Sequence, residues 1–372
     1  MKILLVGNYE FDGSMSMQIW AKALLRELRG RGMDVELISP APVFGRIRRS
    51  AHGVGKWLGY IDRFVLFPRR LRTVAAGVDV VHLCDHGSAP YTSAVKGTPV
   101  IVTCNDMLAI RGARGEIAEM RASLFGRLLQ RWIRKGLGRA GRVVCISQAT
   151  FNDARRILGS DRNLCVVLDG LNYPFQPIPE SEAELRMADL HDIGKPFILH
   201  VGSSHARKNR DGVLRVFAQA AKRADLQLVF AGEELSSGLI DLAHELQVFD
   251  RIVQVVKPEV RVLEALYNRA VALLFPSRYE GFGWPPIEAQ ACGCPVVASD
   301  IPPIAEVLGE SGVVKPLSDE AGMAESIVRI ASDQEFREQL RRRGLENVQN
   351  RFQTSRMMDE YVSIYRELAC QH

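Results

Sequence analysis

The 372-residue sequence contains no long apolar run, no internal repeat and no low-complexity block. Its longest apolar runs, such as residues 271–275, are about a quarter of the roughly 20 residues that a membrane-spanning helix needs. The absence of repeats and biased segments excludes the solenoid, coiled-coil, collagen-like and disordered classes. The opening MKILLVG is too short for a signal-peptide core and is typical of a buried strand. We therefore expect a cytoplasmic globular protein.

Cysteine is sparse and forms no metal-binding pattern. The seven cysteines are an odd number, and most lie inside apolar runs, which is typical of small buried side chains in a reducing compartment. Cys292 and Cys294 are separated by one glycine, but no second cluster of cysteine or histidine accompanies them. We therefore expect no metal site.

Positive charge is concentrated in the first half of the chain. Residues 1–180 carry a net charge of +11, and the remaining residues carry −6. Two basic segments, residues 41–72 and 111–142, contain eight and nine Lys or Arg residues. Trp57 and Phe64 are among the apolar residues interleaved with the first segment.

Three interpretations of the basic segments stay open: a solvated face, an anionic membrane surface or acidic substrate, and nucleic acid. Aromatic residues mixed with basic ones favour a membrane interface over nucleic acid. No zinc finger, RNA-binding aromatic signature or basic helix-turn-helix pattern occurs. We predict no nucleic-acid partner and retain peripheral attachment to the inner face of a membrane as a hypothesis.

Short apolar runs alternate with helical stretches, and a helical tail is expected over residues 335–368. Strands that are apolar on both faces and alternate with helices form parallel sheets covered by helices. A segment rich in Gly, Asn and Pro, residues 169–179, separates two such sets. The predicted strands are residues 3–6, 34–38, 78–83, 100–103, 142–146 and 164–168, then 197–201, 226–231, 251–255, 271–275 and 295–298. The sequence therefore predicts an α/β protein with two Rossmann-like, doubly wound domains facing a central cleft, where open α/β folds bind ligands.

One loop with the sequence EGFGWPPIE follows a predicted strand and leads into a predicted helix. Gly281 and Gly283 allow backbone amides to approach a ligand, and amides at a helix start favour phosphate oxygens. Glu280 and Glu288 could grip two ends of one ligand. The alternative is a loop carboxylate plus a carboxylate that interacts with the helix dipole.

A second loop with the sequence GSSHARKN also lies between a predicted strand and a predicted helix. Gly202 provides a small turn, and Ser203 and Ser204 provide hydroxyls. Arg207 and Lys208 are adjacent cations, which together with a helix start can stabilise phosphate charge without a metal. The loop therefore suits a diphosphate.

Together, GSSHARKN at residues 202–209 and EGFGWPPIE at residues 280–288 resemble the donor site of family-4 retaining glycosyltransferases with the GT-B fold. Further similar stretches extend the resemblance over nearly the whole chain. It implies an N-terminal acceptor-binding domain over residues 1–172 and a C-terminal donor-binding domain over residues 173–350. It also implies a C-terminal helix over residues 351–372 that returns toward the N-terminal domain.

The resemblance implies roles for individual residues. The catalytic candidates are Glu280, which would hold hydroxyls of the donor sugar, and Arg207 and Lys208, which would neutralise the departing nucleoside diphosphate. Glu288 would bind the ribose diol. The other donor-side candidates are Gly202, Ser203, Ser204, Gly281, Phe282, Gly283 and Glu306. The candidates on the acceptor or phosphate side are Gly13, Ser14, His86, Asn105 and Asp106.

One departure from the family pattern lies at the end of the fourth predicted strand. Many relatives carry His-Asp where this sequence has Asn105-Asp106. Asparagine can hydrogen-bond a sugar hydroxyl but cannot act as a base near neutral pH. His86 follows another predicted strand and is a candidate to substitute for the missing histidine.

The resemblance implies a retaining, metal-independent hexosyltransferase with no permanently bound cofactor. The co-substrate would be a GDP- or UDP-sugar, with a slight preference for mannose, and the acceptor a carbohydrate or a lipid-linked carbohydrate in polysaccharide, lipopolysaccharide or glycolipid assembly. Two alternatives stay open: a small-molecule glycoside or disaccharide synthase of the same fold, and a catalytically silent carbohydrate-binding scaffold. The sequence does not name the acceptor or the oligomeric state.

Overall fold

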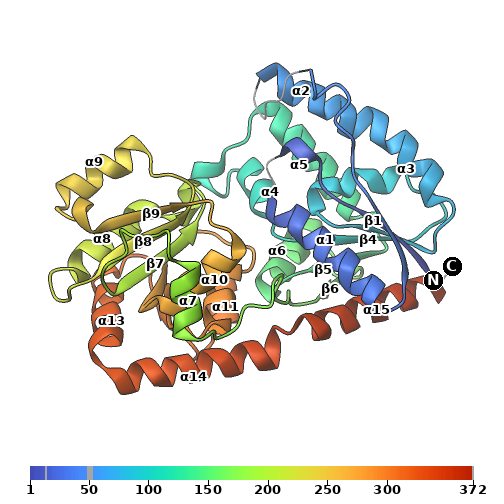
Figure 1. Cartoon of the computed structure of the whole chain (residues 1–372). Helices are drawn as coiled ribbons and strands as arrows, with labels where there is room; N and C mark the ends of the chain where they lie inside the picture. Colours follow the sequence, from blue (N-terminus) through green and yellow to red (C-terminus); the bar gives the residue numbers. More distant parts are fainter. Residues whose placement is uncertain (13–14, 48–52, 371–372) are drawn as a thin grey trace. The chain divides into compact units, whose positions relative to one another are not determined.

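The computed structural model describes residues 1–12, 15–47 and 53–370, which form two compact units (Figure 1). One unit contains residues 1–172 and 354–372, and the other contains residues 173–353. Gly13 and Ser14, two of the acceptor-side candidates, lie outside the described residues, as does part of the first basic segment.

The first unit contains a six-stranded sheet with the order β2-β1-β3-β4-β5-β6, in which all strands are parallel. Central strands such as β1 and β3 are almost entirely buried, as expected for a sheet covered by helices on both faces. The strands are β1 (Lys2–Val6), β2 (Asp34–Ile38), β3 (Val80–Leu83), β4 (Val100–Cys104), β5 (Arg142–Cys145) and β6 (Leu164–Val166).

The helices of the first unit connect these strands and pack against the sheet. Helix α6 is capped at both ends. Ser147 accepts a hydrogen bond from the Thr150 amide at its start, and Gly159 ends it in the left-handed conformation. The helices are η1 (Glu10–Asp12), α1 (Met15–Gly30), α2 (Gly53–Ile61), η2 (Asp62–Leu66), α3 (Phe67–Ala75), η3 (His86–Ser93), α4 (Leu108–Ala113), η4 (Ala118–Met120), α5 (Leu124–Leu137), α6 (Gln148–Leu158) and α15 (Thr354–Cys370).

The second unit contains a parallel sheet with the order β12-β11-β10-β7-β8-β9. Its strands are β7 (Phe197–Gly202), β8 (Gln227–Gly232), β9 (Ile252–Val256), β10 (Ala272–Phe275), β11 (Val296–Ser299) and β12 (Val313–Lys315). Its helices are α7 (Glu180–Arg186), η5 (Ala206–Lys208), α8 (Arg210–Ala220), α9 (Ser237–Glu245), η6 (Phe249–Arg251), α10 (Val260–Arg269), α11 (Trp284–Ala291), α12 (Pro302–Leu308), α13 (Glu320–Ser332) and α14 (Gln334–Arg351). The prediction of an α/β protein with two doubly wound domains is confirmed.

The strand order locates the ligand crevice of each sheet. In the first sheet β1 has β2 on one side and β3 on the other, and in the second sheet β7 lies between β8 and β10. The direction of winding therefore changes between β1 and β3 and between β7 and β10. Open α/β sheets bind ligands outside the carboxyl ends of the strands at such a switch point. The loops that follow these four strands are the places to look for function.

A buried polar cluster attaches the C-terminal helix α15 to the first sheet. The two ring nitrogens of His82 on β3 hydrogen-bond the Tyr365 hydroxyl at 2.6 Å and the Thr103 hydroxyl at 2.8 Å. The Thr103 hydroxyl also contacts the hydroxyl of Tyr361 at 3.1 Å. Burial lowers the pKa of His82 to about 3, so the ring is neutral and its hydrogen bonds hold the helix without a buried charge.

Replacing Tyr365 with Phe would test this attachment. The Tyr365→Phe variant leaves a His82 ring nitrogen unpaired in the core, so we expect the free energy of unfolding to fall by about 1–3 kcal/mol. Denaturant unfolding measures the change. The control Arg366→Gln, at an exposed position on the same helix, should stay within about 0.5 kcal/mol of the native chain. An equal effect of the two substitutions would contradict the attachment.

Candidate functional site

The two motif loops meet at the switch point of the second sheet. The loop after β7 contains the short helix η5, and the loop after β10 leads into α11. The backbone amide of Arg278 donates to the carbonyl of Arg207 at 2.7 Å, and the Arg207 guanidinium donates to the carbonyl of Tyr279 at 3.2 Å. These bonds hold the two loops side by side.

A compact ion cluster lies where these loops touch. Oε1 of Glu280 accepts a hydrogen bond from Nζ of Lys208 at 2.6 Å, and Oε2 accepts one from Nη1 of Arg207 at 2.6 Å. The side chains of Glu280 and Lys208 are less than 10% exposed, whereas Arg207 is 30% exposed. The three residues predicted as catalytic are therefore in direct contact, and Arg207 reaches the surface.

The charge state of Glu280 follows from its neighbours. Burial by itself would raise the pKa of this carboxyl group, but Lys208 and Arg207 outweigh it and hold the pKa below its ordinary value. Lys208 also lies over the ring of Phe275, with Nζ 4.7 Å from the ring centroid. The arrangement keeps an ionised carboxylate and two cations in fixed positions at the strand ends.

Glu288 is held separately, on helix α11. It is buried, and its Oε2 accepts a hydrogen bond from the hydroxyl of Tyr267 at 2.9 Å. Burial raises the pKa of Glu288 to about 7. The helix begins after Gly283, whose φ of 128° favours glycine, and a Cβ there would lie 2.7 Å from Ile304. The backbone path before α11 therefore requires glycine at position 283.

The other donor-side candidates occupy different environments. The amide of Ser204 donates to Oε2 of Glu233 at 2.7 Å, so this amide already has an acceptor. A Cβ at Gly202 would lie 3.4 Å from the Lys208 side chain, which uses that space. Phe282 is buried, with its ring edge against Phe352. The remaining candidates are Ser203, in the loop between β7 and η5, Gly281, which precedes α11, and Glu306, which lies on α12.

In the first unit, residues that follow β1, β3 and β4 converge on Asp85. Nδ2 of Asn8 donates to Oδ2 of Asp85 at 2.7 Å, and Nδ2 of Asn105 is 3.3 Å from Oδ1. Nδ1 of His86 lies 3.2 Å from the same Oδ1. The structure thus brings His86 and Asn105 together, through an aspartate that the sequence analysis missed. The sequence signal was its position, since Asp85 lies two residues after the last residue of β3.

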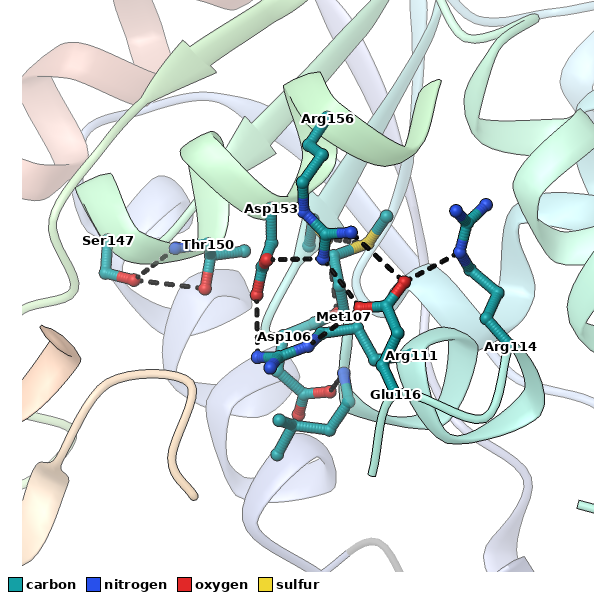
Figure 2. Close-up of polar contacts among 11 residues, drawn as sticks. Asp106, Met107, Arg111, Arg114, Glu116, Ser147, Thr150, Asp153 and Arg156 are labelled. Carbon is teal, nitrogen blue, oxygen red and sulfur yellow. Dashed lines mark hydrogen bonds and ion pairs between the residues drawn. The ribbon is translucent and has the colours of Figure 1, made fainter. Parts of the chain in front are cut away.

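Asp106 takes part in a different set of contacts (Figure 2). Its Oδ1 accepts a hydrogen bond from the amide of Leu108 at 2.9 Å, at the start of α4. Nearby, ion pairs among Arg111, Glu116, Asp153 and Arg156 join α4 to α6. Hydrogen bonds from Arg156 are the main reason that the pKa of Glu116 falls to about 2. Asp106 therefore has a structural contact independent of any ligand.

Metal ligation has no candidate cluster in the described ranges. Among residues 1–12, 15–47 and 53–370, no three His, Cys, Asp or Glu side chains gather closely enough to hold a metal ion. Cys292 and Cys294 are both buried, and neither forms a disulfide.

Comparisons with known proteins match both units. Residues 181–347 match the family described as glycosyl transferases group 1, and residues 17–172 match glycosyltransferase family 4. The chain is 24% identical to N-acetyl-alpha-D-glucosaminyl L-malate synthase of Bacillus anthracis, over 64% of this chain and 63% of that protein. It is 26% identical to O-antigen chain mannosyltransferase B of Escherichia coli, over 59% of each chain. The chain thus matches about 60% of the length of these curated relatives.

A solved structure is similar over the whole chain. The Anabaena protein HepE in complex with UDP and glucose superposes with a TM-score of 0.77 at 15% identity, covering 99% of this chain and all of that one. At this level of identity the similarity establishes the two-domain fold.

Replacing Glu288 with Gln would test the protonation of this buried carboxyl group. Its pKa of about 7 in the folded chain exceeds the ordinary value of 4.5, so folding binds the proton more tightly. The native chain therefore becomes less stable as the pH rises from about 4.5 to 7, because only the unfolded chain releases this proton in that range. The free energy of unfolding of Glu288→Gln should therefore rise, relative to that of the native chain, by up to about 3 kcal/mol between these two pH values.

Denaturant unfolding at about pH 5 and about pH 8 measures this difference. The control Glu325→Gln, at an exposed position in the same unit, should show no such gain. The raised pKa of Glu288 would be contradicted if the free energies of unfolding of Glu288→Gln and the native chain differed by the same amount at both pH values.

Proposed function

The chain belongs to the GT-B glycosyltransferases of group 1 and family 4, and from this membership we propose that it transfers a hexose from a nucleotide diphosphate sugar to an acceptor hydroxyl. The single observation that carries the proposal is the contact of Glu280 with Arg207 and Lys208 at the switch point of the second sheet. We propose that residues 173–353 bind the donor and that the first unit binds the acceptor.

The ion cluster has the groups that a sugar diphosphate requires. Arg207 is partly exposed and, like Lys208, carries donors that can bond to both a carboxylate and phosphate oxygens. Glu280 is kept ionised and can accept hydrogen bonds from sugar hydroxyls. A diphosphate entering here would share the two cations with Glu280. Charge-assisted bonds of this kind are stronger than neutral ones.

The proposed reaction retains the anomeric configuration. The bond between the anomeric carbon and the diphosphate oxygen breaks, and a bond from the acceptor oxygen forms on the same face. The departing phosphate oxygen takes the proton of the acceptor hydroxyl. Preorganised cations at the leaving group stabilise the charge that develops there, so Lys208 and Arg207 carry the main electrostatic contribution without a protein nucleophile.

Glu288 is the proposed ligand of the ribose diol. Its carboxylate form accepts hydrogen bonds from both hydroxyls, and Tyr267 fixes one of its oxygens. Because the pKa of Glu288 is about 7 before a ligand binds, nucleotide affinity should rise as the pH increases through this value. The proposed nucleotides are UDP and GDP. The complex of HepE supports UDP, and the mannosyltransferase of E. coli supports mannose as the first sugar to test.

A surface of the first unit suggests where the acceptor is found. On α5 the apolar residues Leu124, Leu128 and Trp132 are spaced by four and are 79%, 59% and 40% exposed. On α2 and η2, Trp57, Ile61 and Val65 repeat the same spacing and are 54%, 38% and 48% exposed. The two rows meet where the Trp57 and Phe125 rings lie 4.5 Å apart. We call this the aromatic surface.

Basic side chains flank the aromatic surface, namely Lys56, Arg69, Arg70, Arg127, Arg131, Arg134 and Lys135. Apolar anchors beside cations suit peripheral attachment to an anionic leaflet. No helix in the described part of the chain has the length and apolarity needed to cross a bilayer. We propose a cytoplasmic enzyme that attaches to the membrane face and acts on a lipid-linked carbohydrate. The second candidate is a small-molecule glycoside synthase, which the similarity to N-acetyl-alpha-D-glucosaminyl L-malate synthase of B. anthracis favours.

Calorimetric titration with UDP and GDP tests the donor site. We expect the native chain to bind one of them, and Lys208→Ala to weaken binding by about 10- to 100-fold because a charge-assisted contact is lost. Arg207→Ala, at a more exposed position, should weaken binding in the same direction. The control Lys222→Ala, on an exposed part of the same unit, should bind like the native chain. Failure of the native chain to bind either nucleotide would favour the catalytically silent scaffold.

Vesicle flotation tests the aromatic surface. Changing Arg127, Arg131 and Lys135 to Glu should abolish binding to vesicles that contain phosphatidylglycerol, since each basic residue near an anionic surface contributes about 1 kcal/mol. The same charge change at Lys222, Arg223 and Arg342, which are exposed in the second unit, should leave binding intact. If both variants bind the vesicles equally well, the basic residues form an ordinary solvated face, and a small-molecule acceptor is favoured.

A further inference from the structure

The carboxyl ends of β1, β3 and β4 surround one carboxylate, that of Asp85. Two amide groups fix it: Asn8 donates to Oδ2 at 2.7 Å, and Asn105 approaches Oδ1 at 3.3 Å. The side chain of Asp85 remains 16% exposed and that of His86 13% exposed. The carboxylate is therefore held in one orientation while part of it still faces outward, at the switch point of the first sheet.

Two buried polar atoms beside Asp85 lack hydrogen-bond partners within the described ranges. One is Oδ1 of Asn8, whose amide nitrogen is used by Asp85. The other is Nδ1 of His86, which is 3.2 Å from Asp85 without the alignment of a hydrogen bond. Leaving a buried polar atom unpaired costs about 1–3 kcal/mol. Asp85 is therefore accompanied by two polar atoms whose hydrogen-bonding capacity the described residues do not use.

The missing partner has a definable chemistry. Asn8 Oδ1 and the Asp85 oxygens only accept hydrogen bonds, so the ligand must donate. An imidazole nitrogen beside them can donate or accept, according to its tautomer. A hydroxyl group meets both requirements, because it donates one hydrogen bond and accepts others. A carboxylate here disfavours a phosphate group by like-charge repulsion. The fitting ligand is therefore a neutral polyhydroxylated ring.

Asp85 is partly exposed, and its neighbour Asn8 borders a pocket. A Cβ at Gly87 would lie 3.1 Å from Oδ2 of Asp85, so glycine leaves that side of the carboxylate open. Asn8 also lines a pocket of about 280 Å³, whose lining does not include Asp85, His86 or Asn105. This volume is near the lower end of the roughly 300–1,000 Å³ typical of small-molecule sites. The rest of the pocket is lined by residues that include Gln18, Lys22 and Ser39.

We infer that Asp85 binds a hydroxyl of the acceptor sugar, with Asn8 and Asn105 as the residues that orient its carboxylate. This inference rests on the proposed transfer of a hexose to an acceptor hydroxyl. Residue 105 of this chain is asparagine, and the inference assigns the contact with the acceptor to the carboxylate of Asp85 instead. It also restricts the part of the acceptor that enters this crevice to an uncharged sugar ring.

Saturation-transfer difference NMR measures this binding directly. The probes are methyl α-D-glucopyranoside, methyl α-D-mannopyranoside and methyl N-acetyl-α-D-glucosaminide, each offered to the native chain with and without UDP or GDP. We expect at least one glycoside to bind the native chain and Asp85→Asn to bind it about 10- to 100-fold more weakly. The control Asp79→Asn replaces an exposed aspartate at the opposite end of β3 and should bind like the native chain.

Gly87→Ala provides a second variant, because it narrows the space beside Oδ2 and removes none of the hydrogen bonds of Asp85. It too should weaken glycoside binding, even if Asp85→Asn fails to fold. Calorimetry with UDP and GDP on the same samples separates the two proposals, since neither variant should change nucleotide affinity. Nucleotide binding without glycoside binding by the native chain would overturn the assignment of Asp85 alone. Equal glycoside binding by the native chain and both variants would overturn it as well.

Discussion

The contact between Glu280 and the adjacent cations Arg207 and Lys208 is the interaction on which the second unit's function depends. A buried carboxylate is unfavourable unless charges and hydrogen bonds compensate it, and here each oxygen has its own cation at 2.6 Å. This compensation also holds the loop after β7 against the loop after β10. In the proposed function the same cations meet the diphosphate, so that one cluster would give both local order and affinity for the donor.

The first unit repeats this arrangement with different chemistry. Its switch point, between β1 and β3, carries a carboxylate fixed by amides instead of cations. Without a compensating cation, Asp85 repels phosphate and suits neutral hydroxyl groups. In the proposed function, the two units offer complementary groups to the two substrates of a glycosyl transfer: cations for the leaving diphosphate, and hydrogen-bond acceptors for the incoming hydroxyl. We propose that the aromatic surface on α2, η2 and α5 adds a means of reaching acceptors held at a membrane.

Much of the fold was predictable because burial in a parallel sheet leaves a simple pattern, a short run of apolar residues between helices. The pattern failed where burial is incomplete, as in β12, whose three residues Val313–Lys315 are only partly buried. The helical tail expected over residues 335–368 consists of two helices, α14 and α15, which belong to different units. The motif loops were recognisable from glycines, prolines and charges at strand ends. The ion pairs of Glu280 and the convergence on Asp85 were not, because they depend on which strands become neighbours.

The most direct test of the central claim is a crystal structure of the chain with UDP or GDP bound. The account predicts diphosphate oxygens within hydrogen-bond distance of Nζ of Lys208 and of the Arg207 guanidinium, with the ribose hydroxyls on Glu288. A nucleotide bound elsewhere, with Glu280 still holding both cations unchanged, would contradict the claim that this cluster is the donor site.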